Sequence, residues 1–199
     1  MKRREFIQRS ALLGTVASMG LTTGCGDSAN HTLSTAPFIP GKPLPWTNWA
    51  GNESCYPQWR RSPATTEQVV DVMRSARGTV RAVGSGHSFS AVVPTDDTLV
   101  STDLLVGLVS HDADKLQATL RGGTTLHDMG PLLDTIGQAV PNMPDMDYPT
   151  IAGAVASSVH ATGNRYSSMS AYVAGMILVT PTGDVIECSA TKNPEIFQA

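Results

Sequence analysis

The sequence has little charge, few cysteines and no long apolar run. Of its 199 residues, 16% are charged, against about 25% in a typical soluble domain. This composition excludes a coiled coil, a charged disordered tail and a highly helical bundle. The net charge of −3 offers no basic surface for nucleic acid. No stretch reaches the roughly 18 consecutive apolar residues of a membrane span, so we expect no transmembrane helix.

Three cysteines are present, Cys25, Cys55 and Cys188. No two of them lie at the spacing of metal ligands, which excludes a zinc motif, and we expect no metal site. The pattern favours two separate, buried or half-buried thiols at Cys55 and Cys188. A disulfide between them in an oxidising compartment remains the alternative.

Glycine and proline are abundant instead, with 18 and 13 residues. Together with the low charge they favour a strand-rich, turn-rich α+β protein with a core large enough to fold independently. After the leader is subtracted, the length fits one domain, or two small lobes.

The N-terminus, MKRREFIQRSALLGTVASMGLTTGCGDS, pairs Arg3 with Arg4 ahead of Phe6 and Ile7. A mildly apolar run of small residues follows. This pattern resembles a twin-arginine export signal over residues 1–25, which predicts export to the periplasm or cell envelope. The alternative is an ordinary basic N-terminus that leads into a buried helix. Because the twin-arginine route carries folded proteins, many of them loaded with cofactor, the leader hints at a bound redox cofactor.

The leader ends in Gly24-Cys25, like a bacterial lipoprotein cleavage box, although Thr22 stands where an apolar residue is usual. Lipidation of Cys25, as a lipid anchor, and simple cleavage are both open. Residues 26–47 are rich in Ser, Thr, Ala, Asn and Pro and are predicted to be a flexible linker. The folded domain is predicted over 48–199.

Apolar periodicity, caps and turn residues predict the elements of this domain. Helices are expected at 66–77 behind a threonine cap, at 126–136 before Gly137, and from Pro194 behind Asn193. Strands are expected at 79–83, 98–104, 116–121, 172–179 and 184–188, the last two joined by a hairpin turn at 180–183. The last helix has barely begun when the sequence ends at Ala199, so we expect either that the helix packs against something missing or that the chain is a fragment of a longer protein.

The segment RAVGSGHSFS, Arg81 to Ser90, joins a strand to a glycine-rich loop. Such glycines let successive backbone N–H groups form a concavity suited to a pyrophosphate. The spacing is neither the GxGxxG of a Rossmann fold nor a phosphate loop with Lys and Ser/Thr. The alternative is a turn that carries a surface histidine, His87.

A second segment, NMPDMDYPTIAGAVASSVHATG, runs from Asn142 to Gly163. Its small residues allow the backbone to approach a flat ligand closely. The alternative is a tightly packed Ala/Gly helix with a buried histidine.

Together with TNWAGNESCYP near the start, RGGTTLHDMG between them and LVTPTGDVIECS after them, these loops resemble the vanillyl-alcohol oxidase superfamily. Within it, the likeness is to the sugar-lactone and alditol oxidases, such as gulonolactone, D-arabinono-1,4-lactone and alditol oxidase. It covers most of the chain from Trp46 onward. The resemblance implies a two-lobed, α+β PCMH-type FAD-binding domain, of which this chain would be the N-terminal part.

The resemblance also implies the cofactor and its site. FAD would be held by the first loop around its pyrophosphate and by the second segment along its ribityl chain and ring. The residues at matching positions are Ala82, Val83, Gly84, Ser85, Gly86, His87, Ser88, Asp145, Thr150, Gly153, Ser157, Ser158, Val159, His160 and Gly163. His87 corresponds to the histidine that is often bonded covalently to the flavin 8α-methyl group, with His160 as the rival.

The activity implied is oxidation of a carbohydrate-type alcohol, an aldonolactone or an alditol, by hydride transfer to the flavin. Pro144 stands where small or proline residues accompany oxidases in the family, which favours O2 as electron acceptor over another acceptor. The alternatives are a dehydrogenase, a truncated or non-catalytic FAD-binding module, and an envelope lipoprotein that reuses the fold for binding. The segment that supplies the base in relatives has no counterpart here, so no catalytic residue is assigned. We expect His31, His111 and His127 at solvated or helix-surface positions.

Overall fold

The protein is described by a computed structural model over residues 36–198. The predicted leader, with Arg3, Arg4, Cys25 and also His31, lies outside the described residues. Within the described part, no helix is both long and apolar enough to cross a membrane.

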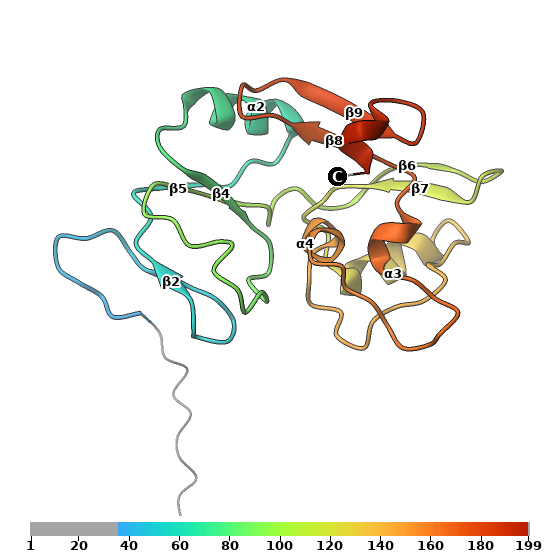
Figure 1. The fold of residues 1–199 in the computed structure, drawn as a ribbon, viewed down its shortest axis with the longest axis horizontal. Coiled ribbons are helices and arrows are strands. Elements are labelled where there is room, and N and C mark those ends of the chain that lie inside the picture. Colours follow the sequence, from blue (N-terminus) through green and yellow to red (C-terminus); the bar gives the residue numbers. More distant parts are fainter. Residues whose placement is uncertain (1–35, 199) are drawn as a thin grey trace, which may run out of the picture. The chain divides into compact units, whose positions relative to one another are not determined.

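The first half of the domain contains two small sheets (Figure 1). Strands β1 (Trp46–Thr47) and β2 (Ser54–Cys55) pair antiparallel. Strands β3 (Trp59–Arg61), β4 (Val80–Val83) and β5 (Thr98–Ser101) form a parallel sheet in the order β3-β5-β4. Trp46 packs against the buried cluster of Val83, Val93 and Leu99. The folded part therefore includes the last two residues of the segment 26–47 that was predicted to be a linker.

Helix α2 (Thr66–Ser75) connects β3 to β4. Its predicted threonine cap is present: Thr65 Oγ1 accepts a hydrogen bond from the Gln68 backbone N–H at 3.3 Å. The helix ends two residues earlier than predicted, and Gly78 turns the chain beyond it at a φ of 72°. The Asp97 carboxylate lies against Gly78 and accepts a bond of 2.7 Å from the Thr79 N–H, so a tertiary contact shapes this turn.

The second half is built around another core. Strands β6 (Leu108–Asp112) and β7 (Gln117–Leu120) form an antiparallel hairpin, and helices α3 (Leu126–Asp134), α4 (Ile151–Ala156) and the 3-10 helix η1 (Met169–Tyr172) follow. Figure 1 shows α3 and α4 beside the β6–β7 hairpin. Apolar side chains of the three helices form the buried cluster, and side chains of β7 pack against it. Its buried members are Leu126, Met129, Leu133, Ala154 and Met169.

The chain then forms the predicted hairpin of β8 (Gly175–Val179) and β9 (Val185–Ser189), followed by α5 (Pro194–Phe197). The turn closes with a bond of 2.9 Å from the Thr180 N–H to the Asp184 carbonyl. The prediction of strand from residue 172 was wrong for its first part, because Tyr172 lies in η1 with its ring against the second core. Asn193 precedes α5 as predicted, but its side chain donates to the Glu187 carbonyl at 2.8 Å rather than capping the helix.

The two cysteines of the domain are both buried and free, as the favoured interpretation predicted. Burial raises the pKa of the Cys55 thiol, because the low-dielectric surroundings disfavour the thiolate. His127 is exposed on the surface of α3, as expected. His111 is also exposed, but it lies in the unpredicted strand β6.

Candidate functional site

The structure brings the two glycine-rich segments into direct contact. The first loop leaves β4 at Gly84, and a Cβ added there would overlap the side chain of Thr150, approaching its Cγ2 to 2.8 Å. Thr150 is only 4% exposed. Only a residue without a side chain lets the loop pass this close to the start of α4. The contact joins the predicted pyrophosphate loop to the predicted ring-binding segment.

The turn between β1 and β2 anchors the first loop from the opposite side. The Trp49 backbone N–H donates to the Gly86 carbonyl at 2.9 Å. Asn48, which is buried, donates from Nδ2 to the Ser88 carbonyl at 2.9 Å, and Asn52 Nδ2 donates to the Phe89 carbonyl at 3.0 Å. These bonds hold the carbonyl groups of the loop toward residues 48–52.

The N–H groups of the same loop are left free. Among residues 36–198, the backbone N–H groups of Ser85, Gly86, His87 and Ser88 have no hydrogen-bond acceptor. Gly86 has a φ of 69°, in the left-handed region that glycine adopts without strain. Successive free N–H groups around a left-handed residue form an anion-binding concavity, and the phosphates of a nucleotide are ligands of this kind.

His87 belongs to this loop and stacks on two aromatic rings. Its imidazole stacks on the indole of Trp49, with ring centroids 5.3 Å apart and planes at 16°. It also stacks on the ring of Tyr148, with centroids 5.7 Å apart and planes at 10°. Nδ1 lies 3.1 Å from the Ser85 carbonyl. Tyr148 belongs to the second segment, so this stack is a further contact between the two predicted parts of the site.

The second segment begins with half-buried residues at 142–144, exposes Asp145 and continues into α4. Thr150 caps α4, with its Oγ1 accepting from the Gly153 N–H at 3.3 Å, and Ser157 Oγ donates to the Gly153 carbonyl at 2.6 Å. Ile151 and Ala152 donate their N–H groups to the 122–124 segment. The small residues are therefore used at the start of α4 to bring separate segments together.

The end of the second segment leaves α4 in irregular turns. Ser158 has a φ of 54°. Val159 packs against the second core. Its N–H donates to the Ala154 carbonyl, and its carbonyl accepts from the Met169 N–H. His160 is exposed, with Nδ1 3.2 Å from the Ala161 carbonyl. The alternative of a buried histidine in a packed helix is therefore wrong. Gly163 is exposed and has a φ of 119°.

Gly122 and Gly123 also help to assemble the site, although they were not predicted to be part of it. A Cβ on Gly122 would lie 3.1 Å from Cβ of Ala152. Gly123 lies so close to the Thr102 carbonyl, just after β5, that a Cβ on it would clash with this carbonyl. The paired glycines in RGGTT were the available signal. They let a third segment pass between β5 and α4.

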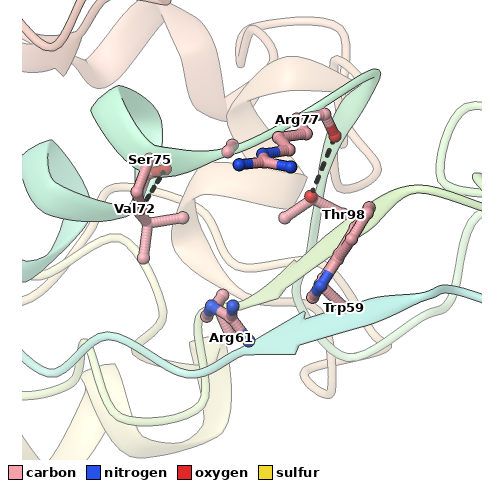
Figure 2. Close-up of a pocket in the computed structure, with 7 residues that line it drawn as sticks. Trp59, Arg61, Val72, Ser75, Arg77 and Thr98 are labelled. Atoms are coloured by element: carbon pink, nitrogen blue, oxygen red, sulfur yellow. Dashed lines mark hydrogen bonds between the residues drawn. The ribbon is translucent and has the colours of Figure 1, made fainter.

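Two hollows open on the parallel sheet. One of about 240 Å³ lies at the ends of β3, β4 and β5 and is lined by Val83, Gly84 and Arg61, among others. The other, of about 260 Å³, lies between α2 and the strands β3 and β5 (Figure 2). Figure 2 shows the bonds that flank it, from Thr98 Oγ1 to the Arg77 carbonyl at 3.4 Å and from Ser75 Oγ to the Val72 carbonyl at 3.3 Å. The second hollow contains none of the predicted cofactor residues, whereas the first adjoins the Gly84 loop.

A comparison with protein families decides what kind of domain this is. Residues 57–189 match the model of the FAD binding domain. The chain belongs to this family. The match includes the loop at Gly84 and the whole segment 142–163. The family and the FAD cofactor predicted from the motifs are thus confirmed.

Curated relatives are named for oxidation of lactones. The chain is 32% identical to L-gulonolactone oxidase from Bos taurus over 161 residues, which cover 79% of this chain and 37% of that protein. It is 35% identical to L-gulono-1,4-lactone dehydrogenase from Mycobacterium tuberculosis, over 72% of this chain and 34% of the relative. A D-arabinono-1,4-lactone oxidase from Candida glabrata is 28% identical, over 76% of this chain and 30% of the relative. The chain therefore spans about a third of the length of these relatives.

Solved structures confirm the fold. A chitooligosaccharide oxidase matches with a TM-score of 0.57 at 18% identity, over 70% of this chain and 32% of that one. The 6-hydroxy-D-nicotine oxidase of Arthrobacter nicotinovorans matches with a TM-score of 0.56 at 22% identity, over the same shares. The predicted α+β, PCMH-type FAD-binding fold is therefore correct for this N-terminal part.

Proposed function

We propose that the protein is an FAD-dependent oxidoreductase that oxidises an aldonolactone or an alditol at a CH–OH group, with O2 as the electron acceptor. The observation that supports it most directly is the row of free N–H groups from Ser85 to Ser88. This row suits the pyrophosphate of FAD. The names of the curated relatives, which are lactone oxidases and dehydrogenases, supply the substrate class.

The residues of the site fit FAD in two respects. Gly84 and Gly86 allow the backbone to lie where a side chain would block it, which a close approach to a phosphate group requires. The aromatic rings of Trp49 and Tyr148 flank the loop with exposed surface, suited to contact with a flat heterocycle. When bound, FAD supplies the electron chemistry by accepting the hydride from the substrate.

We assign His87 as the residue that links FAD covalently, in preference to His160. An imidazole nitrogen would form a bond to the flavin 8α carbon, while the imidazole N–H and one methyl C–H bond break. The two protons and two electrons pass to O2, which becomes H2O2. The choice of His87 is supported by its place within the row of free N–H groups and by its stacking on Trp49 and Tyr148. The exposed His160 is held by its neighbour's carbonyl alone.

The linkage is tested by denaturing electrophoresis of the full chain with flavin fluorescence, followed by peptide mass mapping. We expect fluorescence that survives denaturation in the parent and disappears in His87→Ala, whereas His160→Ala keeps it. A band that persists in His87→Ala, or a modified peptide that contains His160, contradicts the assignment.

Turnover is tested by the absorbance spectrum of the purified protein and by anaerobic titration with a panel of aldonolactones and alditols. Bleaching of the flavin by one member of the panel is expected. Bound FAD that no member bleaches would indicate an FAD-binding module without turnover. A colourless protein would contradict cofactor binding itself.

The electron acceptor needs its own test, because the relatives include both oxidases and a dehydrogenase. Pro144 supports O2, since small or proline residues accompany oxidases at this position in the resembling family. Substrate-reduced protein should reoxidise within seconds of mixing with air. If it stays reduced in air for minutes and reoxidises with a dye, the protein is a dehydrogenase.

A further inference from the structure

The imidazole of His87 is held in a three-ring stack. The indole of Trp49 stacks on it with centroids 5.3 Å apart and the ring of Tyr148 stacks on it with centroids 5.7 Å apart, at interplanar angles of 16° and 10°. Trp49 follows β1 and Tyr148 precedes α4. The stack therefore forms only when the β1–β2 turn and the second segment both dock against the Gly84 loop.

The stack leaves the reactive part of the imidazole uncovered. Both ring nitrogens lie in the ring plane and direct their lone pair or N–H outward along the edge, so rings that stack parallel to the imidazole leave the edge free. One edge is also anchored, because Nδ1 lies 3.1 Å from the Ser85 carbonyl, which can act only as an acceptor. The two contacts together fix the plane of the ring and its rotation within that plane.

Core packing does not account for the two outer rings. Trp49 is 55% exposed and Tyr148 is 66% exposed, and neither belongs to a buried cluster of the described part. Phe89 supports Trp49 edge-on, with centroids 6.3 Å apart and planes at 89°. Side chains that stack on His87 at such exposure contribute order at this one imidazole rather than general stability.

We propose that Trp49 and Tyr148 are positioning residues that hold the His87 imidazole ready for its bond to FAD. The inference rests on the proposed covalent linkage at His87. An imidazole that is already held in one orientation loses less conformational entropy on reaching the bonding geometry than a freely rotating histidine side chain would. The bond formed is the one from the His87 imidazole nitrogen to the flavin 8α carbon, and the oxidant is O2, which becomes H2O2.

The stack itself is measured without FAD. The flanking rings should shift the ring-proton NMR signals of His87 upfield in the FAD-free full chain, and Trp49→Ala or Tyr148→Ala should move these signals back toward free histidine. Trp49→Ala keeps the backbone N–H that anchors Gly86. Phe38→Ala is the matched control, because Phe38 is 66% exposed, like Tyr148, and lies outside the stack.

The positioning role is measured by the rate at which flavin fluorescence becomes resistant to denaturation after FAD is added. Each alanine variant should slow this rate about threefold to tenfold, the factor that corresponds to one lost aromatic pair. Trp49→Phe and Tyr148→Phe should restore most of it, because a phenyl ring can still stack. The non-covalent affinity for FAD, measured on the His87→Ala background, should change less than the rate.

The outcomes separate this inference from the proposed function. If the parent attaches FAD through His87 and the double variant Trp49→Ala/Tyr148→Ala attaches it as fast, only the positioning role is overturned. The same holds if the His87 signals are unshifted in the parent. A parent that binds FAD without forming any bond overturns the covalent assignment and the positioning role together.

Discussion

The side chain of Thr150 occupies the space in which residue 84 would carry a Cβ atom. This single contact joins the end of β4 to the start of α4. It brings together the loop that offers free N–H groups and the segment that carries Tyr148. The site therefore depends on the absence of a side chain at Gly84.

Replacing this glycine should disrupt the site. In Gly84→Ala the new methyl group would overlap Thr150, and forced overpacking of this kind costs about 1–3 kcal/mol. We expect a lower free energy of unfolding and loss of FAD binding, measured by denaturant titration and by flavin absorbance. Gly130→Ala is the matched control, because nothing lies within 4 Å of a Cβ on this α3 residue. If Gly84→Ala binds FAD like the control, the contact does not matter for the site.

Tyr172→Phe should stabilise the protein. In residues 36–198 the buried hydroxyl of Tyr172 has no hydrogen-bond partner, and leaving such a group unsatisfied costs about 1–3 kcal/mol. Removing it should raise Tm by about 2–4 °C for each 1 kcal/mol gained. Tyr56→Phe is the comparison, because the Tyr56 hydroxyl donates to the Pro37 carbonyl at 2.9 Å. A lower Tm in Tyr172→Phe would show that its hydroxyl has a partner in solution.

The contact of His127 with Asp147 should make the second segment sensitive to pH. Nδ1 of His127 lies 2.8 Å from Oδ2 of Asp147, and this hydrogen bond, together with the charge of Asp147, raises the pKa of His127 above its usual value. Because the pKa of His127 is raised in the folded state, the contact contributes to the free energy of unfolding in full below about pH 6.5, the pKa of a histidine in the unfolded chain. This contribution is lost as pH rises through the folded pKa.

Asp147→Asn should therefore lower the His127 pKa, measured by NMR titration. The stability difference between parent and variant should be larger at pH 6 than at pH 9. The contribution is small, because both side chains are exposed to solvent. Asp145→Asn alters a nearby exposed carboxylate and should leave the His127 titration unchanged. An identical His127 pKa in Asp147→Asn and the parent would contradict the contact.

The export signal remains a prediction from sequence. The twin-arginine receptor reads both guanidinium groups, and lysine keeps the charge but not their planar geometry. Changing Arg3 and Arg4 together to Lys should therefore abolish export, measured as the protein recovered in the periplasmic or envelope fraction. Lys2→Arg is a control that should export normally. Normal export of the double Lys variant would assign the leader to another pathway.

Local chemistry was enough to predict several elements from the sequence. Thr65 lies ahead of an amphipathic run and caps α2 through a bond that spans three residues. The turn at 180–183 closes within itself. The family could be predicted for a related reason, since its motifs are short stretches whose glycines and small residues are required locally. The sequence thus determined the family and the cofactor, and it predicts the two segments that hold FAD.

Only the tertiary structure decided how the site is assembled. Strand β3 has three residues, too few to show a periodic pattern, and it exists because β5, from a distant part of the chain, pairs with it. Tyrosine favours β-strands, but Tyr172 lies in η1, because packing against the Leu126 cluster outweighs this strand preference. Trp49, His87 and Tyr148 lie far apart in sequence, and no local interaction relates them. Their stack forms because docking of three segments at Gly84 and Thr150 places the rings face to face.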